Sequence, residues 1–75
     1  MRPFDLSGSS CRAARELLRM SQSDLAGLAG ISVATLRRFE AGMGEPSVYA
    51  AGQLLAALQA EGIEFIGPGR DPELR

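Results

Sequence analysis

Hydrophobic residues recur along most of the chain at steps of three and four, the spacing of amphipathic helices. Four segments show this pattern, and each begins at a serine that can cap a helix. A glycine follows each of the last three segments, as is typical of helix C-termini. The pattern predicts four helices, from Ser9 or Ser10 to about Met20, from Ser21 to Gly30, from Ser32 to Gly42 and from Ser47 to Gly62.

The hydrophobic period changes after the fourth segment. From Ile63 to Ile66, apolar and polar positions alternate as in a short strand, before Gly67-Pro68-Gly69. No second strand pattern is visible, and an isolated strand is not stable in water. Either this segment is not a strand, or it pairs with a second copy of the chain. The expected layout is an arm over 1–8, a helical domain over 9–61, a dimerisation strand over 62–69 and a disordered tail over 70–75.

Length and composition exclude several classes of protein. Seventy-five residues make one small domain, and 45% hydrophobic content is too high for a wholly disordered chain. There is no histidine and only one cysteine, so we expect no imidazole catalysis, no metal site and no cofactor. No nucleophile–base pair or carboxylate pair is visible, so we expect no enzyme.

No apolar run approaches the roughly 20 residues of a membrane span, and no export signal is visible, so we expect a cytoplasmic protein. Cys11 is expected in the core.

The charge is unevenly distributed. The net charge is −1 and the isoelectric point about 5.3, which by themselves argue against nucleic acid as a partner. Residues 11–40 nevertheless carry five arginines against three acids, a local charge of +2, and local basicity is what contacts phosphate. All eight basic residues are arginine, which suggests a bacterial or phage source with GC-rich DNA.

The informative stretch is residues 22–40, where two short helices are joined by a tight turn at Gly30. Ala26 is small enough to lie where the two helices cross. The inner side carries Leu25, Ala29, Ile31, Leu36 and Phe39. The second of these helices is left with a small, polar and basic outer face, which fits the roughly 12 Å wide major groove of DNA.

On these residues the sequence resembles the XRE-family helix-turn-helix regulators, the group of the lambda and 434 repressors and Cro. The resemblance covers about residues 11–60 and rests on Ser21-Gln22, Ala26, Gly30, Leu36 and Phe39-Glu40-x-Gly42 at matching spacings. It implies an all-α fold, a compact four-helix lambda-repressor-like domain, with double-stranded DNA as the partner.

The resemblance also implies roles for individual residues. Gln22 would bond a phosphate, and the backbone near Ser47 would face another. Val33, Ala34 and Arg38 stand where relatives touch base edges, with Ser32, Thr35 and Arg37 beside them. Arg15 and Glu40 match a structural ion pair of the family. Glu45 departs from the family, because relatives often carry basic residues in that loop.

Two functions follow as hypotheses. The first is a homodimeric repressor, associated with the nucleoid, that reads an inverted-repeat operator; its dimer contacts would be Leu58, Ile63, Phe65 and Ile66. The second is a protein-interaction module of the same fold, such as an antitoxin or co-regulator. That module would grip a protein partner through the fourth helix or the 63–66 edge, and the acidic isoelectric point favours it.

Overall fold

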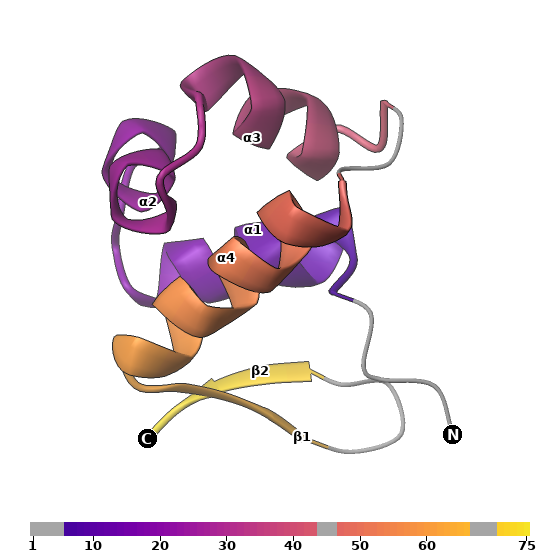
Figure 1. Cartoon of the computed structure of the whole chain (residues 1–75). Coiled ribbons are helices and arrows are strands. Elements are labelled where there is room, and N and C mark those ends of the chain that lie inside the picture. Colours follow the sequence, from indigo (N-terminus) through magenta and orange to yellow (C-terminus); the bar gives the residue numbers. More distant parts are fainter. Residues whose placement is uncertain (1–5, 44–46, 67–70) are drawn as a thin grey trace.

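Four helices and one β-hairpin make up the protein in a computed structural model that describes residues 6–43, 47–66 and 71–75 (Figure 1). The four predicted helices and the predicted strand are present. In chain order the elements are α1 (Gly8–Leu17), α2 (Gln22–Ala29), α3 (Val33–Glu40), α4 (Val48–Ala60), β1 (Ile63–Ile66) and β2 (Asp71–Leu74).

A serine caps the start of every one of these helices. In each case the serine Oγ accepts a hydrogen bond from the backbone N–H three residues later, which satisfies a donor that the helix itself cannot pair. The caps are Ser7, Ser21, Ser32 and Ser47. At α2 the bond is reciprocated, because the Asp24 carboxylate accepts from the Ser21 N–H at 3.1 Å. Three of the four cap positions agree with the prediction.

The first helix begins earlier than predicted. Ser7 is its cap rather than Ser9 or Ser10, and the helix ends at Leu17 instead of continuing to Met20. Leu6, expected in an arm, is buried in the core. Ser7, Ser9 and Ser10 can all cap a helix; the structure uses Ser7, and Gly8 directly after it lies against the Phe39 backbone in the last turn of α3. Residues 1–5 of the expected arm lie outside the described residues.

The core collects one apolar stripe from each helix together with the first residue of β1. Its fully buried larger side chains include Leu25, Leu36, Leu54, Leu58, Ile63 and Cys11. Ala14, Ala26 and Ala29 fill positions where helices approach closely. Val48 and Leu17 are 92% and 47% exposed, because the buried line of α4 runs through Ala50, Leu54 and Leu58 and that of α1 through Cys11 and Ala14.

The C-terminus corrects the prediction of a disordered tail. Asp71–Leu74 forms β2, which pairs antiparallel with β1, so Ile63 faces Leu74 and Phe65 faces Pro72. The strand 63–66 therefore has a partner within its own chain. The sequence did not reveal β2 because aspartate, proline and glutamate are poor strand formers, and only pairing with β1 and contact with α1 make this segment extended.

A proline is tolerated in β2 because of its register. The Arg75 N–H donates to the Gly62 carbonyl at 2.8 Å. Gly62 and Arg75 are therefore a hydrogen-bonded pair, next to the pair formed by Ile63 and Leu74. Antiparallel positions alternate between bonded and non-bonded, so Pro72 falls at a position where β1 requires no N–H from it.

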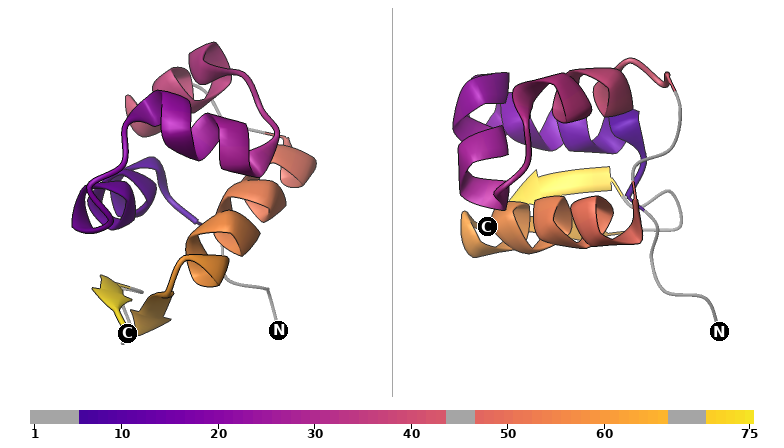
Figure 2. Two further views of the ribbon diagram at one scale, coloured as in Figure 1. Left: turned by 90° about the vertical axis from the view of Figure 1, so that its left-hand side faces the viewer. Right: turned by 45° about the horizontal axis from the view of Figure 1, so that its top comes forward.

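The hairpin and α3 lie at opposite ends of the molecule (Figures 1 and 2). Helices α1, α2 and α4 fill the space between them, with α1 beside β2 and α4 beside β1. Of the helices in the described part of the chain, none combines the length and the apolar character that crossing a membrane requires. This arrangement leaves the outer surface of α3 uncovered by the described part of the chain.

Candidate nucleic-acid interface

The corner between α2 and α3 is held by a left-handed turn and a small-residue contact. Gly30 has φ +72°, a conformation that suits glycine, and the next N–H, from Ile31, donates back to the Ala26 carbonyl at 3.0 Å. Ala26 and Ala29 are buried here. The Gln53 amide of α4 donates to the Ala29 carbonyl at 3.2 Å. The end of α2 is thus fixed from two sides, which fixes where α3 begins.

The outward surface of α3 is small and basic. Leu36 and Phe39 are buried, so the helix is anchored through the opposite side. At 3.6 residues per turn, Ala34 and Arg38 lie one above the other at the centre of the exposed surface, with Arg37 on one flank and Thr35 on the other. Val33 is half-buried against the core. Ser32 and Thr35 are exposed, and their hydroxyl oxygens lie 2.8 Å apart.

A buried carboxylate ties the end of α3 to α1 and α2. Glu40 has a side chain only 3% exposed, and it accepts from Arg15 Nε at 2.9 Å and from Arg15 Nη2 at 3.0 Å. The Gln22 amide donates to the same carboxylate at 3.1 Å. Arg15 Nη1 donates to the Met20 carbonyl at 2.9 Å. The ion pair implied by the family resemblance is therefore present, in bidentate geometry.

This contact keeps Arg15 charged. The hydrogen bond to Glu40 raises the pKa of the Arg15 guanidinium above its ordinary value, against the opposing effect of partial burial. The Arg15–Glu40 ion pair, together with the Gln22 hydrogen bond, joins α1, α2 and α3, and the two charges of the pair neutralise each other. The geometry of the α2–α3 corner therefore does not depend on DNA being present.

An open concavity lies beside this pair. Its described lining comprises Arg12, Arg15, Ser21, Gln22, Arg37, Glu40 and Ala41. Three of these residues are cationic and one is anionic, so the lining carries an excess of positive charge. One hydrogen of the Gln22 amide is engaged by Glu40, and the second remains as a donor.

Sequence reasoning did not single out Arg12, Ser21 or Ala41 as part of this site. From the sequence, Arg12 is a surface charge that could also reach a phosphate; the signal that it belongs here is its spacing of three from Arg15, which places both on the same side of α1. Ser21 and Ala41 come close only through the packing of α2 against α3, which the sequence pattern does not specify.

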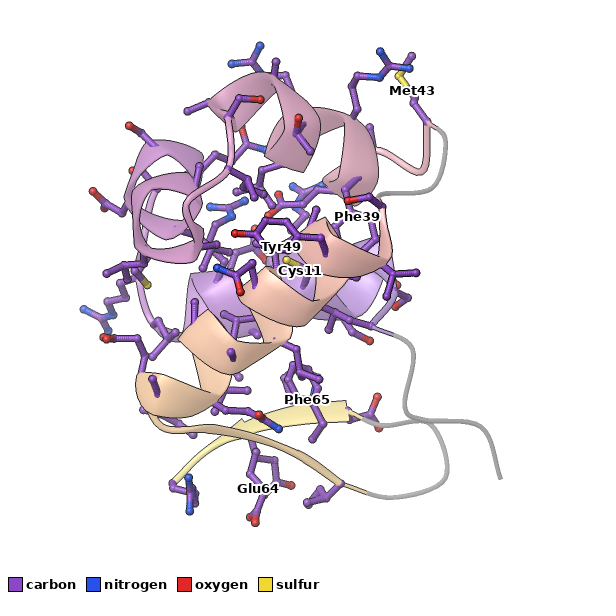
Figure 3. All side chains as sticks on the ribbon, in the orientation of Figure 1. Cys11, Phe39, Met43, Tyr49, Glu64 and Phe65 are labelled. Atoms are coloured by element: carbon purple, nitrogen blue, oxygen red, sulfur yellow. The ribbon has the colours of Figure 1, made fainter. Side chains whose placement is uncertain are left out.

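The residues expected to form a dimer contact divide into two pairs. Leu58 and Ile63 are fully buried in the core of their own chain, so their side chains cannot touch a second subunit. Phe65 is half-buried and points from β1 toward the helices, whereas Glu64 points away from them (Figure 3). Ile66 remains 39% exposed. The expectation was wrong for Leu58 and Ile63, because the spacing of apolar residues in a sequence does not distinguish a core contact from an intersubunit contact.

Comparison with known protein families identifies the family of the chain. The sequence profile of a helix-turn-helix family matches residues 12–65, which is well over half of the chain. The chain belongs to the XRE-type helix-turn-helix family. It is accordingly a DNA-binding helix-turn-helix regulator, and the family is one of regulatory domains rather than enzymes. No curated protein matches the chain significantly.

Proposed function

We propose that the protein is a homodimeric, sequence-specific repressor that acts on DNA at the nucleoid and reads an inverted-repeat operator through the major groove. The observation that carries this proposal is the outward surface of α3, which presents Ala34 and Arg38 at its centre on a corner that the Glu40 contacts hold rigid. A helix of this kind is what a major groove admits.

The proposed contacts divide by chemistry. Arg38 is the residue of α3 suited to bond a guanine edge, and Val33 and Ala34 offer apolar surface to a thymine methyl. Ser32, Thr35 and Arg37 flank them. Gln22 and the backbone N–H groups that follow Ser47 bond phosphates on either side, since each lies in the first turn of a helix.

The dimer follows from the operator geometry. Half-sites of a two-fold dimer lie about 34 Å apart, one helical turn of DNA. The Cα extents of one chain are 29 × 27 × 18 Å, so two copies bound at that spacing lie side by side. Because Leu58 and Ile63 are buried, we place the contact at the part of the hairpin that still carries surface, Phe65 and Ile66.

Selection of bound sequences from random duplex DNA tests the proposal. We expect a two-fold symmetric consensus. Arg38→Ala is expected to weaken binding to that consensus by about 1–3 kcal/mol and to relax the preference at one base pair. Arg75→Ala, which removes the same charge at the hairpin end, is the control. Equal loss on consensus and random DNA for Arg38→Ala would refute base readout by this residue.

A second candidate function is favoured by α4. This 13-residue helix contains no charged side chain, and its first turn exposes Val48 and Tyr49, at 92% and 69%. Such a surface suits a protein partner, as in an antitoxin or co-regulator. A salt titration on random duplex discriminates between the two, because binding through phosphates weakens steeply as salt rises. If the protein does not bind DNA even at low salt, the protein-interaction module is favoured.

A further inference from the structure

We infer that Gln53 of α4 is a positioning residue for DNA recognition. Its hydrogen bond to the Ala29 carbonyl holds α4 at one position relative to α3. Gln53 thereby determines how well the protein distinguishes its operator from random DNA, although its own side chain does not contact DNA. The inference rests on the proposed function, which assigns the base edges to α3 and a phosphate to the start of α4.

The two parts of the surface proposed to contact DNA lie on different helices. Arg38 is on α3, and the Ser47 cap begins α4. A set of binding groups recognises its ligand well only when the groups are held within about 0.5 Å of the productive geometry. The backbone of α4 packs closely on α2 but approaches α3 closely at few points. The spacing between α3 and α4 is therefore set through α2.

Apolar contact between α2 and α4 does not by itself fix that spacing. Both helices contribute side chains to the core, among them Leu25 and Ala29 of α2 and Leu54 and Leu58 of α4. Hydrophobic burial is not directional, so it opposes separation of two helices more than a small slide or rotation of one along the other. A hydrogen bond depends on distance and angle, and it therefore selects one arrangement.

Gln53 supplies this directional contact. Its Nε2 donates to the Ala29 carbonyl at 3.2 Å, and no other hydrogen bond joins α4 to another helix within the described part of the chain. Ala29 is the last residue of α2, so its carbonyl has no partner within the helix. Gly30 then turns the chain, and the Ser32 cap begins α3. The bond thus attaches α4 directly beside the turn that orients α3.

The place of Gln53 along α4 explains why the bond affects recognition. Gln53 is half-buried, and it lies six residues after Ser47, about 9 Å along the helix axis. A small rotation of α4 about this point moves the backbone N–H groups near Ser47 relative to Arg38. Binding to the operator needs both contacts at once. Binding to random DNA uses phosphate contacts that do not depend on sequence, so it tolerates the change better.

The test compares the affinity of the full chain for its selected operator with its affinity for a random duplex. Gln53→Leu keeps most of the side-chain volume but donates no hydrogen bond. We expect it to lower the ratio of the two affinities by about 2- to 30-fold, the range for residues that act on a site through others. Gln53→Lys keeps an N–H donor on a stem of similar length and should restore the ratio.

Gln59, which is exposed on the same helix, provides the matched controls. Gln59→Leu and Gln59→Lys make the same chemical changes without touching the bond to Ala29, so both should leave the ratio unchanged. Thermal unfolding defines a temperature at which every variant is fully folded, and binding is measured there. A role of Gln53 in stability alone would then leave the ratio at its wild-type value, and that result would overturn the inference.

A second arm measures the arrangement of the helices in the free protein. Spin labels on Ala34→Cys in α3 and Ala56→Cys in α4, both at exposed positions, report the distance between the two helices. Cys11 is buried and stays unlabelled. We expect Gln53→Leu to broaden or shift the distance distribution and Gln53→Lys to restore it. An unchanged distribution in Gln53→Leu would show that the bond does not place α4.

The failure of this inference can be told apart from the failure of the proposed function. If the wild-type chain selects an operator and the folded Gln53→Leu variant loses affinity for both duplexes by the same factor, the inference is wrong, while the regulator stands. If the wild-type chain selects no sequence from random DNA, the proposed function fails, and the effect of Gln53 on discrimination fails with it.

Discussion

Gly8 lies where the start of α1 passes the last turn of α3. A Cβ added to Gly8 would overlap the carbonyl oxygen of Phe39, which is backbone and cannot swing aside. We expect Gly8→Ala to lower the free energy of unfolding by about 1–3 kcal/mol, the usual range for forced overpacking. Chemical denaturation measures the change.

Gly27 provides the matched control for this prediction. It lies inside α2, and a Cβ there would meet nothing within 4 Å. Gly27→Ala should raise the free energy of unfolding by about 0.5–1 kcal/mol, because alanine restricts the unfolded chain and favours helix. Equal effects of the two substitutions would contradict the close approach at Gly8.

Cys11 gives the fold a dependence on alkaline pH. Burial, with a smaller contribution from the charge of Glu40, raises the pKa of its thiol from 9.0 to about 12. Below pH 9 the thiol is neutral in both states. Between pH 9 and 12 only the unfolded chain releases the proton, so the free energy of unfolding falls as pH rises.

The comparison variant for this effect is Cys11→Ala. It has no thiol to ionise, so its stability deficit relative to wild type should shrink as the pH is raised above 9. Thermal unfolding of both proteins at matched pH values measures the difference. If the difference in stability between wild type and Cys11→Ala stays constant from pH 8 to above pH 9, the fold does not raise the pKa of the Cys11 thiol.

At the scale of the element, the hairpin contains a local conflict. Glu64 and Glu73 face each other across the two strands, and both are exposed. Like charges at directly opposite positions destabilise a strand pair. We expect Glu73→Lys to stabilise the fold by about 0.2–1 kcal/mol at low salt, and Glu73→Gln to give a smaller gain.

Salt is the control for this substitution. The gain should shrink at high ionic strength, where exposed charges are screened. Thermal unfolding at low and high salt measures it. If Glu73→Lys were no more stable than Glu73→Gln, the cross-strand register of β1 and β2 would be in question.

Local chemistry made most of the elements predictable. Ser21, Ser32 and Ser47 cap their helices as expected because capping involves only the next few residues. The strand β2 was not predictable, because its pairing with β1 and its contact with α1 join segments whose own propensities do not indicate a strand. The site was also predictable only in part. The outward surface of α3 follows from helical periodicity, whereas the inclusion of Arg12 in the concavity depends on the packing of α1 against α3.

At the scale of the whole molecule, charge is segregated between two ends. The arginines of α3 are exposed at one end, and exposed acidic residues outnumber the single arginine, Arg75, in the described part of the other end, around the hairpin (Figure 1). These acidic residues are Glu61, Glu64, Asp71 and Glu73. Although the net charge is only −1, the charge is unevenly distributed. The electrostatic field of DNA therefore favours the orientation with α3 toward the duplex and the hairpin away from it.

The proposed dimer contact at the hairpin makes a prediction at this scale. Ile66→Glu places a charge on an exposed apolar position of β1. We expect this variant to sediment as a monomer at concentrations where the wild-type chain is a dimer, because an unpaired charge in an apolar contact is costly. Leu17→Glu, at a similarly exposed position of α1, should leave the dimer intact. Persistence of the Ile66→Glu dimer would exclude the contact at the hairpin.

The contacts that hold α3 in place all lie away from the centre of its outward surface. Leu36 and Phe39 face the core and Glu40 faces α1 and α2, whereas the side chains of Ala34 and Arg38 point to solvent. Exchanging residues at these two positions therefore leaves the scaffold untouched. A small combinatorial library at positions 34 and 38 should yield folded regulators with new operator preferences, so this short domain is a practical starting point for retargeting.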